Sequence, residues 1–179
     1  MDHFEGIIRT LLEHNGYWVR QSYKVNLTQQ EKRDTGKPTI PRPEIDLLAF
    51  KPSQNSILAL EVKSYFDSIG VRVKDVAASH SVAIGRYKLF TCENYRNIVM
   101  KRLASDLVAE GMADPNPKIQ LGLVVGKVYQ SRTDELRALF NERGWFFWSP
   151  GDVKEKVIAL ASKSYENDPA IISAKILMR

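Results

Sequence analysis

The chain reads PEIDLLAF at residues 43–50 and ILALEVK at residues 57–63, two apolar runs that each contain charged residues. Runs of this length and composition predict β-strands, and the polar residues 51–56 between them predict a hairpin connection. Because strand side chains alternate between two faces, Glu61 and Lys63 should point the same way. The hairpin is expected to bring Asp46 beside Glu61.

The same alternation divides residues 44–49 between two faces. One face is expected to carry Glu44, Asp46 and Leu48, and the other Ile45, Leu47 and Ala49. Two carboxylates beside one ammonium are the groups needed to bind a hard divalent cation and a phosphoryl group. The alternative is an ordinary cross-strand ion pair on a solvated sheet face, which contributes little to stability.

This arrangement resembles the PD-(D/E)xK nucleases, the restriction-endonuclease-like superfamily. The matching residues are Pro43 and Asp46, followed by Glu61-Val62-Lys63. In the family the first acid often follows proline directly, whereas Glu44 and Ile45 intervene here. Asp46 is therefore the better metal candidate and Glu44 a lesser one. The resemblance covers residues 1–65 well, and the remainder only through the order of its elements.

The resemblance implies a Mg²⁺-dependent DNA nuclease, in particular an endonuclease, in which Mn²⁺ can replace Mg²⁺. Asp46, Glu61 and the Val62 carbonyl would bind the metal, and Glu5 would help directly or through a water. Lys63 would position the attacking water. Asp46, Glu61, Lys63 and Glu5 are thus the candidate catalytic residues, and the products would carry a 5′-phosphate and a 3′-hydroxyl.

Residues 2–16 are expected to form a helix that leads into the first strand. Its apolar stripe comprises Phe4, Ile7, Ile8, Leu11 and Leu12. Glu5 lies at the edge of this stripe, whereas Glu13 lies nearly opposite and should face solvent. Glu5 is therefore the better site candidate, although Asp2-x-x-Glu5 also fits a capping box at the start of the helix.

The remaining pattern completes an α/β fold. Strands are expected at 17–27, 119–129 and 145–148, a polar loop at 28–42, and helices at 92–110 and 133–143, with two more after Ser149-Pro150 and Asp168-Pro169. Residues 65–84 give weak signals. With the resemblance, this order predicts a restriction-endonuclease-like three-layer sandwich with a mixed central β-sheet flanked by helices. A single nuclease-like domain would span residues 1–179, with its core at about 1–148 and C-terminal helices at about 150–179.

Composition agrees with this reading. The chain has 179 residues, 44% of them hydrophobic, and a formal net charge of +5, which favours an anionic partner such as DNA. Its single cysteine, Cys92, excludes an internal disulfide. No secretory segment follows Met1 and no apolar run reaches membrane-spanning length, so a cytoplasmic protein without membrane association is expected. A homodimer is expected only from the symmetry of cutting two strands.

Basic residues occur throughout the segments expected to flank the site: Lys51, Arg72, Lys74, Arg86, Lys88, Arg96, Lys101 and Arg102. A minority are expected to contact phosphates, and Tyr65 and Tyr87 either stack on bases or pack. Two other functions stay open, a nuclease-like module that binds DNA or protein without cutting, and an RNA-processing subunit. The pattern does not support a cysteine nucleophile, a zinc site or an ATP-binding loop.

Overall fold

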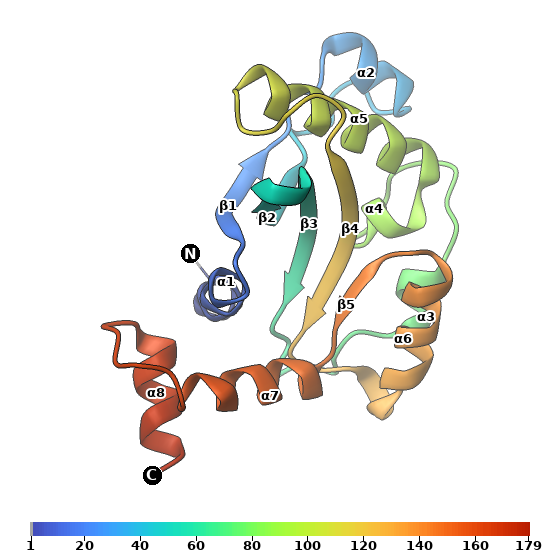
Figure 1. The fold of residues 1–179 in the computed structure, drawn as a ribbon. Coiled ribbons are helices and arrows are strands. Elements are labelled where there is room, and N and C mark those ends of the chain that lie inside the picture. Colours follow the sequence, from blue (N-terminus) through green and yellow to red (C-terminus); the bar gives the residue numbers. More distant parts are fainter. Residues whose placement is uncertain (1) are drawn as a thin grey trace.

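The computed structural model describes residues 2–179, which fold around a five-stranded mixed sheet (Figure 1). Its strands, in spatial order, are β1 (Trp18–Lys24), β2 (Glu44–Lys51), β3 (Ser56–Lys63), β4 (Lys118–Val125) and β5 (Phe146–Trp148). The first three strands are antiparallel, and β3, β4 and β5 are parallel. The predicted α/β class with a mixed central sheet is therefore confirmed.

Helices cover both faces of the sheet. One face packs against α1 (His3–His14) and α7 (Pro150–Leu160), with α8 (Pro169–Leu177) packed on α7, and the other against α3 (Val73–Ala77), α4 (Lys88–Thr91), α5 (Glu93–Ala109) and α6 (Thr133–Glu142). Short 3-10 turns, η1 (Pro52–Gln54) and η2 (Tyr129–Ser131), follow β2 and precede α6. No helix among residues 2–179 combines the length and the apolar character needed to cross a membrane.

Two buried clusters separate these layers. The α5-side core contains Tyr95, Val99 and Leu103 of α5, together with Phe90 and Phe140. The α1-side core contains Phe4, Ile8 and Leu11 of α1, together with Val153 and Ile171. Strand β3 supplies both cores in alternation, with Ile57 and Ala59 on the α5 side and Leu58 and Leu60 on the α1 side. Burial on both faces explains why this strand is an unbroken apolar run up to Glu61.

The predicted loop at residues 28–42 is wrong in part, because it contains helix α2 (Gln29–Asp34). Thr28 and Glu31 form a capping box at its start. The Glu31 carboxylate also accepts bonds from Arg102 of α5 at 2.9 and 3.0 Å, which fixes α2 against the outer side of α5 (Figure 1). This charged segment is therefore a helix docked on α5, held by a contact between two residues that lie 71 positions apart in sequence.

Both predicted C-terminal caps are present. Ser149 caps α7, and its hydroxyl accepts from the Asp152 amide. The Asp168 carboxylate caps α8 by accepting from the Ala170 amide at 2.8 Å and the Ile171 amide at 3.3 Å. Asp168 also accepts a bond from the Thr10 hydroxyl at 3.0 Å. The α8 cap therefore also ties the C-terminal helix to α1.

Replacing Asp168 with alanine should lower the free energy of unfolding by about 1 kcal/mol, because two helix amides and the Thr10 hydroxyl lose their acceptor. Urea denaturation followed by circular dichroism measures this change. Glu166→Ala is the control, since the exposed Glu166 carboxylate meets only the His14 ring, at 3.8 Å. Equal losses in the two variants would show that the cap contributes nothing specific.

Candidate active site

The backbone pairing of β2 and β3 ends where the acidic residues begin. The last paired residues in this direction are Leu47 and Leu60. Beyond them, the Val62 amide donates to Asp46 Oδ2 at 2.7 Å. The Asp46 carboxylate therefore accepts a hydrogen bond from a backbone amide that faces the opening between the two strands.

The alternation of side chains also breaks at Asp46. Ile45 packs in the α5-side core, whereas Leu47 packs in the α1-side core. Residues two apart on a regular strand share a face, so the predicted grouping of Ile45 with Leu47 and Ala49 is wrong. The neighbouring strand is distorted at the same level, where Ser22 has a φ of 52°. Asp46 thus lies at a local twist of two adjacent strands.

Lys63 bridges the two acids that the hairpin brings together. Its Nζ lies 3.0 Å from Asp46 Oδ2 and 3.0 Å from Glu61 Oε2. The side chains of Lys63, Asp46 and Glu61 are 20%, 19% and 13% exposed, respectively. The prediction that the hairpin places Asp46 beside Glu61 is confirmed, and such limited exposure distinguishes this cluster from an ion pair on a solvated face.

Burial and charge perturb the titration of the cluster. Burial raises the pKa of the Glu61 carboxyl and the Asp46 charge raises it further, while Lys63 acts in the opposite direction. Burial alone would lower the pKa of the Lys63 ammonium, but the charges of Glu61 and Asp46 outweigh burial and raise that pKa. A buried amine held as a cation between two acids is typical of a functional site.

Glu5 approaches the cluster from α1. Its pKa is raised, first by burial and then by the negative charge of Asp46, with Lys63 opposing the shift. The N-cap of α1 is the Asp2 carboxylate, which accepts from the Phe4 amide at 2.9 Å. Within residues 2–179, Glu5 makes no capping-box bond, so its carboxylate is not committed to the helix end.

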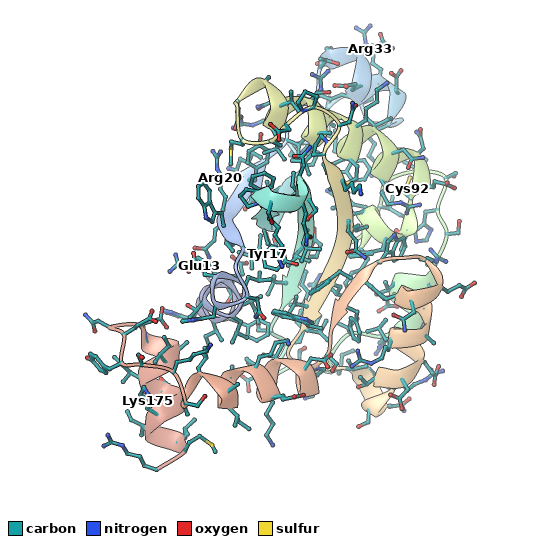
Figure 2. The ribbon with its side chains drawn as sticks, viewed as in Figure 1. Glu13, Tyr17, Arg20, Arg33, Cys92 and Lys175 are labelled. Atoms are coloured by element: carbon teal, nitrogen blue, oxygen red, sulfur yellow. The ribbon has the colours of Figure 1, made fainter. Side chains whose placement is uncertain are left out.

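Glu13 lies on the outer side of α1 (Figure 2), with a side chain that is 46% exposed and 3.7 Å from Arg9. The prediction that Glu13 faces solvent is therefore confirmed. Glu5, in contrast, has a pKa that the charge of Asp46 raises.

The Val62 carbonyl faces the same opening as the Val62 amide. The next carbonyl, that of Lys63, accepts from the Gly126 amide at 2.8 Å, on the β4 side of β3. Backbone groups of successive strand residues point to opposite edges, so the Val62 carbonyl points toward β2, past the end of their ladder. The carbonyl is thereby placed beside Asp46 as a third oxygen donor.

Two groups extend the site toward α5: Lys88, which was expected among the flanking basic residues, and Tyr95, which sequence reasoning did not assign to the site. Tyr95 is fully buried, and its hydroxyl has no hydrogen-bond partner within residues 2–179. Burial and then the Glu61 charge raise its pKa, so the phenol lies within the electrostatic reach of Glu61. Lys88 also acts on Glu61 and lies 5.5 Å from the Tyr95 ring centre. Helical periodicity predicts that Tyr95 is buried, but not which group its hydroxyl meets.

Several basic residues proposed to flank the site are engaged elsewhere. Arg102 pairs with Glu31, and Arg96 donates to the carbonyls of Leu89 and Phe90 at 3.2 Å. Arg86, in contrast, is exposed and donates to the Tyr65 hydroxyl at 3.2 Å. Arg96 and Arg102 are thus committed to other partners, and which of the remaining cations contact a phosphate stays a prediction.

Among residues 2–179, no three Asp, Glu, His or Cys side chains are arranged so that they could hold a metal ion. The oxygen atoms in and beside the opening are those of the Asp46 and Glu61 carboxylates and the Val62 carbonyl. Comparisons with protein-family models, curated proteins and solved structures find no match to this chain. Any functional assignment must accordingly come from the chemistry of the site.

Replacing Lys63 with methionine should cost about 2 kcal/mol of stability at pH 8, because two mostly buried carboxylates lose their common cation. Without Lys63, the pKa of Glu61 rises further, so the folded variant binds a proton more readily than the unfolded chain. The loss should therefore shrink as the pH falls toward that raised pKa.

Urea denaturation between pH 5 and pH 8 measures this dependence. Lys154→Met, which changes an exposed lysine of α7, is the matched control and should show little loss at any pH. A Lys63→Met loss that does not vary with pH would mean that Lys63 contributes packing and not charge.

Proposed function

We propose that this chain is a Mg²⁺-dependent DNA endonuclease with a restriction-endonuclease-like fold. The observation that carries the proposal is the position of Lys63 Nζ, 3.0 Å from both Asp46 and Glu61, at the opening between β2 and β3. A solvent-exposed ion pair would not require three charged groups to lie mostly buried at the end of a central strand.

The arrangement of elements supports the finer fold assignment. Helix α1 precedes an antiparallel β1-β2-β3 meander, and α5 then crosses over to β4, which is parallel to β3. This order is the one that the resemblance implies, with both acids and the lysine on the central hairpin. The two layers of helices correspond to the outer layers of the proposed sandwich.

The donor set at the opening fits a hard divalent cation. Mg²⁺ binds oxygen ligands, keeps several waters, and commonly takes only one or two carboxylates from the protein. Asp46, Glu61 and the Val62 carbonyl would hold it, and Glu5 would complete the shell through a water. When bound, the cation would polarise a phosphoryl oxygen and acidify a water.

One N–H group of the Lys63 ammonium remains for the substrate. This ammonium has three N–H groups, and two of them are directed at the Asp46 and Glu61 carboxylates. The third can orient a water or offset charge on a phosphoryl oxygen. Water would then attack phosphorus and the P–O3′ bond would break. The O3′ atom would take a proton, leaving a 3′-hydroxyl and a 5′-phosphate.

The net charge of +5 favours a polyanionic substrate, and it does not by itself distinguish DNA from RNA. DNA is proposed because the nuclease family that residues 43–63 resemble acts mainly on DNA. A homodimer remains a prediction, since two copies of this site would allow both strands of a duplex to be cut.

Cleavage of circular, linear and branched DNA with Mg²⁺, Mn²⁺ or EDTA tests the function. Asp46→Asn and Lys63→Ala should each reduce Mg²⁺-dependent cleavage by about a hundredfold or more, because each removes a group that acts on the reacting phosphate or its cation. Glu44→Gln is the matched control on the same strand, since Glu44 is exposed and lies 3.9 Å from Lys24. It should cut like the unmodified chain.

Nicking of the circle would identify an endonuclease, and preferential cutting of RNA would point to RNA processing instead. A folded protein that binds DNA but cuts no substrate with any metal would refute the catalytic proposal. That outcome would leave a nuclease-like binding module.

Glu5→Gln and Glu13→Gln form a second matched pair on one helix. If Glu5 supports the cation through a water, Glu5→Gln should raise the Mg²⁺ concentration for half-maximal cleavage by about tenfold. Glu13→Gln should leave it unchanged, because Glu13 faces solvent. Magnesium titrations of the cleavage rate measure both values, and identical titration curves would remove Glu5 from the site.

A further inference from the structure

The turn at residues 64–70 leaves β3 directly after Lys63 and exposes two large apolar side chains. Phe66 is 59% exposed and Ile69 is 55% exposed. Ordinary loops expose small or polar residues at their tips, so this turn differs in composition from a simple connection. Its position at the end of the central strand places it beside the proposed active site.

Backbone contacts hold the 64–70 turn rigidly at both ends. At its start, the Lys63 carbonyl accepts from the Gly126 amide at 2.8 Å, and at its end the Val71 amide donates to the Lys127 carbonyl at 3.0 Å. A Cβ atom at Gly126 would lie 2.8 Å from the Phe66 ring and would also clash with the Ser64 carbonyl. Only glycine allows this close approach of the turn to the end of β4.

Tyr65 adopts a left-handed backbone conformation, with a φ of 51°. Such a conformation is strained for an aromatic residue and persists only where the surrounding contacts impose it, as they often do at binding sites. The conformation separates the two neighbouring aromatic side chains. Tyr65 reaches Arg86 through its hydroxyl, and Phe66 packs against α1.

The ring of Phe66 contacts α1 on one side and is partly exposed to solvent. It meets the ring of Phe4 edge-on, with ring centres 5.3 Å apart and planes at 84°. Phe4 is buried and directly precedes Glu5 in α1. An immobilised aromatic ring with an exposed surface is a platform on which a nucleic-acid base can stack.

Two exposed cations contact residues of the turn. Lys127 is exposed, and its Nζ lies 3.4 Å from the Phe66 carbonyl oxygen. Arg86 is also exposed, and it donates to the Tyr65 hydroxyl at 3.2 Å. Asp67 is the one acid of the turn itself. The positive charges outnumber it, and a polyanion is therefore the partner that the charges complement.

We propose that the 64–70 turn is a subsite for an unpaired nucleotide, in which Phe66 stacks on the base and Lys127 and Arg86 attract the neighbouring phosphates. This proposal rests on the proposed function, because the subsite would select which DNA reaches the nuclease site. Bases inside a duplex already stack on each other and present no free face to Phe66. The preferred substrate is therefore single-stranded, flapped or branched DNA.

Binding can be measured without cleavage, by fluorescence anisotropy of a labelled 12-nucleotide oligo-dT in EDTA. A labelled 12-base-pair duplex is the comparison ligand. Phe66→Ala should weaken oligo-dT binding by about tenfold and duplex binding much less, because it removes one stacking contact. Phe66→Leu keeps an apolar side chain against Phe4, and it should show the same loss while retaining the fold.

Trp18→Ala is the matched control, because Trp18 is an aromatic residue with 75% exposure on the edge strand β1. It should leave oligo-dT binding unchanged. Lys127→Gln should reduce the slope of log affinity against log salt by about one, as expected for the loss of a phosphate contact.

The outcomes separate this proposal from the nuclease assignment. Cleavage that depends on Asp46 and Lys63, with oligo-dT binding unaffected by both Phe66 variants, would overturn the subsite and leave the nuclease intact. Oligo-dT binding that depends on Phe66 in a protein that cuts nothing would support the subsite alone. Absence of oligo-dT binding in the unmodified chain would also overturn the subsite.

Discussion

One ammonium group holds the site together. Lys63 lies between two carboxylates that would otherwise repel each other at a mostly buried position, and it does so where the β2-β3 ladder opens. The opening leaves the Val62 amide without a strand partner, and Asp46 takes it. The Asp46 side chain thus both accepts a backbone hydrogen bond and pairs with Lys63. Removing the cation would leave the opened strands lined by unpaired negative charge, which is costly inside a protein.

The layers on either side of the sheet determine what can reach this cluster. On the α1 side, the helix brings Glu5 close enough to respond to Asp46. On the α5 side, the Tyr95 hydroxyl and Lys88 lie within the electrostatic reach of Glu61. The cluster is therefore surrounded by titratable groups from both layers. The apolar cores behind them bury Glu61 and Tyr95, and that burial is the main cause of their raised pKa values.

Local patterns in the sequence predicted much of this arrangement. Strict alternation along β3 places Glu61 and Lys63 on one face. The short polar segment 51–56 predicts the hairpin that brings Asp46 beside them. The same rule failed at Ile45, because the strands twist at Asp46 and Ser22, and a non-glycine residue with positive φ has no sequence signature. Helix α2 was missed although Thr28 and Glu31 form a capping-box pattern, because its six residues bury no apolar face and its tie to Arg102 comes from a distant part of the chain.

The β2-β3 hairpin has a consequence for how the chain organises its charges. Both acids and the lysine lie within residues 44–63, so bringing them together closes only a short loop and costs little chain entropy. Their burial, in contrast, requires β4 and α5, which join the hairpin from much farther along the sequence. Charge neutralisation is thus a local event and desolvation a global one. The β2-β3 hairpin can thus form its ion pair first, and β4 and α5 then cover it.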